Sequence, residues 1–283
     1  MIAHFLSPRV VLMLSMLLCS TCTYCHELSG SFSKLLNLQV SEDISASGLR
    51  GDGDRYRKIS VPWRSDCSLV SKALCQEFWF RASYMNMQSI VEDEGLFRWD
   101  AYGLLAGTGI KFNLSETFSF RGGIGIGHSL IYNHSRGLAD YVALNWQQKH
   151  ITFINPTLEG IATIDNFSFR SGVSFLLPLG IWSGARDFSA HSGSYSLRAS
   201  YTFRNVVNLM GRTSNLIVGN NIGGFYGSNH RRDLGFSLVD EIQLLADIPL
   251  KWQGQTLYLR VGPGILLADN GSKGVSISFG LNM

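Results

Sequence analysis

Residues 118–132, "FSFRGGIGIGHSLIY", alternate between two kinds of side chain over their whole length. One set is apolar and consists of Phe118, Phe120, Ile124, Ile126, Leu130 and Tyr132. The other set is polar or very small and consists of Ser119, Arg121, Gly123, Gly125, Gly127 and Ser129. Because successive side chains of a strand point to opposite faces, this pattern predicts one long β-strand with an apolar face and a polar face.

The same alternation recurs along the chain. A near copy, "FSFRSGVSF", begins at Phe167, and residues 255–268 and 275–283 alternate in the same way. Strands of soluble proteins usually have five or six residues, whereas tilted strands that cross a bilayer need about ten. The sequence therefore predicts an all-β fold, a transmembrane antiparallel up-and-down β-barrel with a polar interior.

The alternation does not by itself decide which face points outward. A soluble barrel or sandwich turns its apolar face inward, and a membrane barrel turns it toward lipid. An export signal, the Arg and Ser content of the small-residue face, and aromatic residues at strand ends favour the membrane orientation. These aromatic residues are Phe112, Phe118, Tyr132, Phe167 and Tyr226.

Turn signals divide residues 77–283 into ten strands. They are expected near 77–88, 98–113, 117–132, 151–164, 166–180, 193–206, 214–227, 234–250, 255–268 and 274–283. Tight connections at 115–117, 165–166 and 253–254 alternate with longer ones at 89–97, 133–150 and 181–192. Short periplasmic turns and long outer loops are typical of outer-membrane barrels. A further hairpin within 133–150, where "YVALNWQQ" is strand-like, would raise the count to twelve.

The chain before the predicted barrel divides into two parts. Residues 1–25 are expected to be an export signal, because Arg9 precedes the apolar run "VVLMLSMLL" at 10–18. "CTYCH" at 22–26 matches the pattern for haem attachment but straddles the end of this signal, so no cofactor is expected. Residues 26–76 are expected to be a periplasmic segment, with a short helix in 66–76 after the capping Asp66.

Two cysteines lie well inside the mature chain, Cys67 and Cys75. In an oxidising compartment they are expected to form a disulfide. On one unbroken helix their alpha carbons would lie about 12 Å apart, so the bond requires a turn between them. Two buried free thiols are the alternative.

Residues 77–283 resemble bacterial outer-membrane β-barrels, and among them the solitary barrels similar to autotransporter translocator domains. The resemblance rests on the alternating strands and on the C-terminal "SISFGLNM", which is similar to the strand signal read by the barrel-assembly machinery. It departs from that signal by ending in Met283 instead of an aromatic residue, and such barrels have twelve strands. The resemblance implies localisation in the outer membrane, with its lipid and the assembly machinery as partners, and leaves the oligomeric state open.

Few features point to chemistry. The net charge is only +3 and no long Lys/Arg run exists, so nucleic-acid binding is not expected. "GHSL" at 127–130, "NHSR" at 133–136 and "AHSG" at 190–193 each place His beside Ser, but adjacent strand residues face opposite sides and cannot cooperate. We therefore predict no enzyme, no catalytic residue and no metal site. An outer-membrane enzyme acting on lipid or peptide at the rim, or a surface-interaction barrel, remains the alternative.

The polar face predicts the residues that line the lumen. They are Arg81, Lys111, Arg121, Arg170, Arg198, Arg204, Arg260, Glu241 and Asp247, together with Glu77 and Glu159. Paired with one another, these charges would fill a closed barrel. A surplus of arginine around an open pore would instead favour anions. The sequence thus predicts a structural or narrow channel-like role without catalysis.

Overall fold

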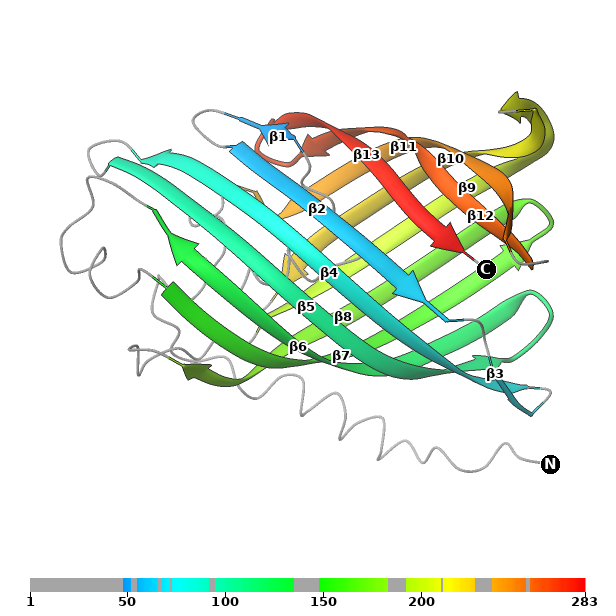
Figure 1. Ribbon diagram of the computed structural model, residues 1–283, viewed down its shortest axis with the longest axis horizontal. Coiled ribbons are helices and arrows are strands. Elements are labelled where there is room, and N and C mark those ends of the chain that lie inside the picture. The colour runs from blue at the N-terminus through cyan, green and yellow to red at the C-terminus, as the bar shows by residue number, and fades with distance from the viewer. Residues whose placement is uncertain are drawn as a thin grey trace.

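The computed structural model describes residues 48–51, 55–65, 68–71, 73–91, 95–134, 148–182, 192–209, 211–226, 236–252 and 255–282. No helix long and apolar enough to cross a membrane occurs among these residues. All their regular structure is β-strand, in one antiparallel sheet that closes on itself (Figure 1). The predicted export signal, residues 1–25, lies outside the described residues.

The strands follow one another around the barrel in chain order. They are β1 (Leu49–Arg50), β2 (Arg55–Arg64), β3 (Ser68–Ser71), β4 (Leu74–Val91), β5 (Gly95–Asn113), β6 (Phe118–Asn133), β7 (Gln148–Ile164), β8 (Phe167–Trp182), β9 (Ser192–Leu209), β10 (Arg212–Tyr226), β11 (Leu238–Trp252), β12 (Gln255–Ala268) and β13 (Lys273–Asn282). The ring closes because β1 pairs with both β13 and β2, and β2 pairs with β4. β3 pairs only with the first residues of β4.

This closed barrel has twelve strands and confirms the predicted fold class. The ten strands expected in 77–283 are β4–β13. The other two are β1 and β2, which precede residue 77, so the sheet begins at Leu49, within the segment expected to lie outside the barrel. The proposed hairpin in 133–150 is not needed to reach twelve, and residues 135–147 lie outside the described part.

The helix predicted within 66–76 is wrong. Residues 68–71 are the strand β3, and residues 74–76 open β4 and pair with it. The spacing of Leu69, Val70 and Leu74 suits a helix, but pairing with an existing sheet edge satisfies the same backbone groups and outweighs the local preference.

The two ends of the barrel differ. At one end, called here the turn end, the connections 114–117 and 165–166 are tight. At the other, called here the loop end, 134–147 and 183–191 are longer. The connection predicted at 89–97 is shorter than expected, because β4 runs to Val91 and β5 starts at Gly95.

The apolar face of the strands points outward, as the membrane orientation predicts. On β6, Ile124 and Ile126 are 53% and 58% exposed, whereas Arg121 is 8% exposed and Ser129 is fully buried. The same contrast holds on other strands, where Ile59, Phe78, Leu104, Ile110, Leu158, Phe169, Val218, Leu244, Ile265 and Ile277 are exposed. The buried interior holds Lys58, Glu77, Arg81, Asn155, Ser194, Asn221, Glu241 and Asp247.

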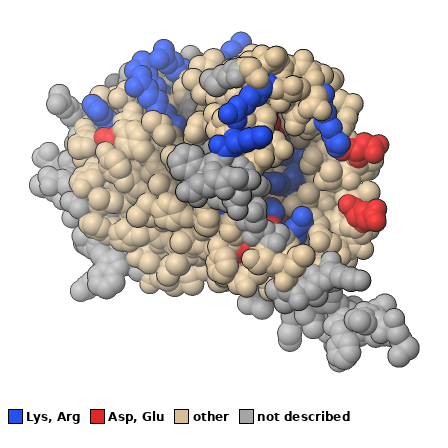
Figure 2. Space-filling view, turned by 45° about the vertical axis from the view of Figure 1, so that its right-hand side comes forward, with Lys and Arg blue, Asp and Glu red and all other residues tan. Residues whose placement is uncertain are grey.

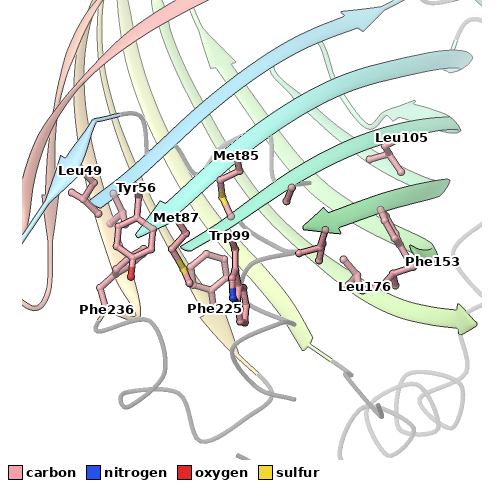
Figure 3. Packing of buried hydrophobic residues seen from close by; sticks show 14 of the residues in the cluster. Leu49, Tyr56, Met85, Met87, Trp99, Leu105, Phe153, Leu176, Phe225 and Phe236 are labelled. Atoms are coloured by element: carbon pink, nitrogen blue, oxygen red, sulfur yellow. The ribbon is translucent and has the colours of Figure 1, made fainter. Parts of the chain in front are cut away.

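The interior is not polar throughout. Toward the loop end, apolar side chains from most strands pack against one another inside the barrel (Figure 3). The cluster includes Leu49, Tyr56, Met85, Met87, Trp99, Ile131, Phe153, Leu176, Phe225 and Phe236. Tyr56 and Phe236 meet edge to face, with ring centroids 5.0 Å apart. We call this set the loop-end apolar cluster, and it narrows the lumen on that side.

Candidate functional site in the barrel lumen

One side of the lumen is filled by charged side chains from neighbouring strands. Arg121 on β6 binds Glu159 on β7 at 2.6 Å and Glu77 on β4 at 2.8 Å. Arg64 at the end of β2 reaches the same Glu77 at 3.3 Å. Each carboxylate here accepts from arginine, so the buried charges compensate one another. We call these four residues the ion-pair cluster.

Trp79 fills the space beside this cluster. Its indole lies over Gly107 and Gly123, where a Cβ would come within 2.4 Å or less of the ring. The absence of a side chain at Gly107 on β5 and Gly123 on β6 thus leaves room for the indole of Trp79. The remaining space on this side is a cavity of only about 60 Å³, bordered by Arg64, Trp79 and Arg121.

A larger cavity of about 460 Å³ occupies the other side of the lumen. It lies between β9–β12 and the two strands at which the barrel closes, β2 and β13. Its charged lining residues are Lys58, Arg198, Arg260 and Glu241. Figure 2, which looks toward the turn end, shows Lys and Arg side chains gathered around and within a hollow. We call this space the lateral cavity.

The lateral cavity reaches the weakest part of the barrel wall. β2 and β13 lie beside each other, but in the described residues their backbones are joined only through β1, which is two residues long. The cavity touches inward residues such as Ser60 and Ser278, and also the outward Ile59, Val61 and Ile277 of the same strands. The lumen therefore extends to the outer surface between β2 and β13, along a line that we call the seam.

Two arginines face each other on the wall of the lumen. Arg170 on β8 and Arg198 on β9 are direct cross-strand partners, and both point inward by parity. Arg198 borders the lateral cavity. Like charges directly opposite each other on neighbouring strands are destabilising unless other groups compensate them. Arg170 makes no ion pair with the described residues, whereas Arg198 has a partner of its own.

Two acidic residues on β11 lower the positive charge of the cavity wall. Asp247 binds Arg260 through two hydrogen bonds of 2.7 Å. Glu241 accepts a hydrogen bond from Ser276 on β13. The basic residues that border the cavity are thus Lys58, Arg198 and the paired Arg260, and Arg170 lies beside Arg198 on β8.

Of the predicted lumen residues, Arg81, Arg121, Glu241 and Asp247 are buried inside the barrel. Lys111, Arg170, Arg198 and Arg260 are half-buried on the inward parity. Arg204 differs, because it is exposed and donates to the carbonyl of Asp165 at the β7–β8 turn, so it lies at the turn-end rim. Cys75 is disulfide-bonded, but Cys67 lies outside the described residues, so the pairing of these two stays a prediction.

Sequence reasoning missed several residues of the site. Lys58, Ser60 and Arg64 belong to β2, which was assigned to the segment before the barrel. The alternation in "RYRKISVPWR" is visible in retrospect, but Pro62 and the short run hid it. The role of Trp79 is revealed only by its position over Gly107 on the adjacent strand and Gly123 on the strand beyond it.

The described residues contain no group of three or more His, Cys, Asp or Glu side chains placed to hold a metal ion. His128 is exposed and Ser129 is buried, so this adjacent pair points to opposite sides of the wall.

Comparison with known proteins adds little. No family model matches the chain, and no curated protein matches it. One solved structure that it resembles is a crystal structure of a Pseudomonas aeruginosa FadL homologue, with a TM-score of 0.41 and 9% sequence identity. The match covers 80% of this chain and 65% of the FadL homologue.

Proposed function

We propose that the protein is an outer-membrane β-barrel that forms a narrow channel with a preference for small anions. The observation that carries the channel is the lateral cavity of about 460 Å³ with its basic wall, enclosed in a barrel whose apolar residues face outward.

The outer surface matches the thickness of a membrane. Tyr84, Tyr102 and Tyr132 form a row of neighbouring aromatic rings on the outside near the loop end. Phe112, Phe118 and Phe120 lie outward near the turn end. Tyr102 and Phe112 are separated by ten positions on β5; at about 3.3 Å per residue and a tilt of about 40°, this places them about 25 Å apart along the barrel axis. An apolar band of that height between two aromatic girdles is typical of outer-membrane barrels.

The path through the lumen is restricted. The ion-pair cluster and Trp79 fill the side formed by β4–β7, and the loop-end apolar cluster narrows the outer half. A barrel of twelve strands is narrower than the open channels of sixteen-stranded porins. The lateral cavity is much larger than the cavity beside the ion-pair cluster, so a solute would pass along β9–β13.

The charge preference follows from the wall of that space. Lys58 and Arg198 border the lateral cavity, with Arg170 opposite Arg198 across the β8–β9 ladder. Glu241 is the one acidic residue among its described lining, and it is hydrogen-bonded to Ser276. A confined space with surplus positive charge concentrates anions.

Bilayer recording tests this proposal directly. The purified, refolded chain without residues 1–25 would be inserted in a planar bilayer under a salt gradient, with heat-modifiable gel migration as the measure of folding. Stable steps of small conductance with an anion-biased reversal potential are expected. A folded barrel that carries no current would contradict the channel, and a cation bias would contradict the role of the basic wall.

The orientation of the barrel in the membrane and its partners are also part of the proposal. The short turns and the end of β13 would face the periplasm, and the longer loops would face outward. Outer-membrane lipid and the barrel-assembly machinery are the proposed partners. The kinship with autotransporter-like barrels stays a prediction that rests on "SISFGLNM". No catalytic role is proposed.

A further inference from the structure

A small polar group interrupts the apolar outer surface near the loop end. His128 on β6 and His150 and Thr152 on β7 project from the outer face, where their neighbours on β5 and β6 are Leu104 and Ile126. His128 lies at the level of Leu104, two residues below the tyrosine row, and is exposed. A channel lumen on the opposite face of these strands gives no reason for two histidines here.

The two imidazoles are held close together. The Nε2 atom of His128 lies 3.3 Å from the Nδ1 atom of His150, and the ring centroids are 5.5 Å apart. This separation is longer than most nitrogen hydrogen bonds, which measure about 2.7–3.2 Å. It matches two ligands of one metal ion, because nitrogens at about 2.1 Å from a tetrahedral ion lie about 3.4 Å apart.

The second nitrogen of His128 is also engaged. Its Nδ1 atom lies 3.1 Å from the hydroxyl oxygen of Thr152. When that nitrogen carries the proton and donates to Thr152, the lone pair of Nε2 is directed toward His150. A metal-binding histidine is typically oriented in this way, by donating its other N–H to an oxygen.

We infer that His128 and His150 form a two-histidine site for a first-row divalent metal ion of the Zn²⁺, Cu²⁺ or Ni²⁺ class. Imidazole nitrogen suits these ions, whereas Mg²⁺ and Ca²⁺ require oxygen ligands. His128 Nε2 and His150 Nδ1 would supply two positions, and water would complete the coordination. Thr152 would act as the positioning residue for the His128 ring.

Calorimetric titration of the folded barrel with Zn²⁺ tests the site. Wild type is expected to bind one equivalent that depends on both histidines, and His128→Asn or His150→Asn should each weaken that binding by about tenfold or more. Thr152→Val should weaken it by about tenfold while leaving both ligands in place. Electron paramagnetic resonance with Cu²⁺ should show two nitrogen couplings in wild type and one in each single variant.

His134→Asn is the matched control, because His134 is an exposed histidine at the same end but pairs with Asp100 at 3.4 Å. Heat-modifiable migration shows which variants fold. Equal Zn²⁺ binding by wild type and the folded H128N/H150N double variant would overturn the assignment. A loss caused by His134→Asn alone would also overturn it. Neither result depends on whether the barrel conducts ions. The test of the metal site is therefore independent of the test of the channel.

Discussion

Arg170 on β8 lies directly opposite Arg198 on β9, and both side chains point into the barrel. Like charges on directly opposite strand residues repel each other and lower the stability of the folded state unless they are compensated. An anion between the two guanidinium groups would relieve that repulsion. The pair therefore links the stability of the wall to the charge of the solute that it faces.

Removing this pair should change ion selectivity. In the double variant Arg170→Gln/Arg198→Gln, the reversal potential under a salt gradient should shift toward zero or toward a cation preference, since one basic residue of the cavity wall and its cross-strand neighbour are removed. Arg204→Gln is the control, because Arg204 is exposed at the turn-end rim. Unchanged selectivity in a folded double variant would show that these arginines do not contact the permeating ion.

Removing Trp79 should widen the filled side of the lumen. Trp79→Ala should increase single-channel conductance, and it should lower the free energy of unfolding by about 3–5 kcal/mol, because a large buried side chain leaves a cavity. Trp63→Ala is the control, since Trp63 is 44% exposed on the outer face. If both variants conduct alike, removal of the indole does not open a second path beside the ion-pair cluster.

Filling the lateral cavity should have the opposite effect. Gly280 borders this cavity, and a Cβ added there meets nothing within 4 Å. Gly280→Trp should therefore fold and reduce conductance by obstructing the space between β13 and β9. Gly160→Trp is the matched control, because a Cβ at Gly160 is equally unobstructed but lies on β7, away from the cavity. We expect wild type and Gly160→Trp to conduct equally, and Gly280→Trp to conduct less than either.

The ion-pair cluster should matter for stability more than for conduction. Arg121→Ala leaves Glu77 and Glu159 buried without their shared partner, and should cost about 3–5 kcal/mol in the free energy of unfolding measured in urea. Arg204→Ala should change that energy by no more than about 0.5 kcal/mol, because it is an exposed side chain. A cost below about 1 kcal/mol for Arg121→Ala would mean that water compensates the two carboxylates.

The sequence predicted the barrel because alternation is a direct consequence of strand geometry. Each of the ten strands from β4 to β13 carries its own apolar and polar faces, so each could be recognised alone. β1 could not, since two residues have no period, and the alternation of β2 is short and interrupted by Pro62. The helix expected around Cys75 failed for a related reason, because pairing with a sheet edge decides the structure of a short segment.

The inward charges could also be predicted, since parity gives direction. The ion-pair partners of these charges could not be predicted from parity. Arg121 on β6 pairs with Glu77 on β4, for example, although β5 lies between the two strands. Parity also fails to give the surroundings of Arg204. Its position in the alternation is inward, but it lies near the end of β9, so its side chain is at the turn-end rim. His128 and His150 are separated by a long connection, and only the register of β6 with β7 brings them together.

The pairing of Arg50 with Lys273 joins the first and last strands of the chain. Contacts so distant in sequence carry the largest loop-closure cost, so this one should form after all the hairpins between β4 and β13. Until then the protein is an open curved sheet with two free edges, each able to pair with another chain. A deletion of the last ten residues would leave it permanently in that state. The pairing of β1 with β13 and β2 thus removes two sheet edges that could otherwise pair with another chain.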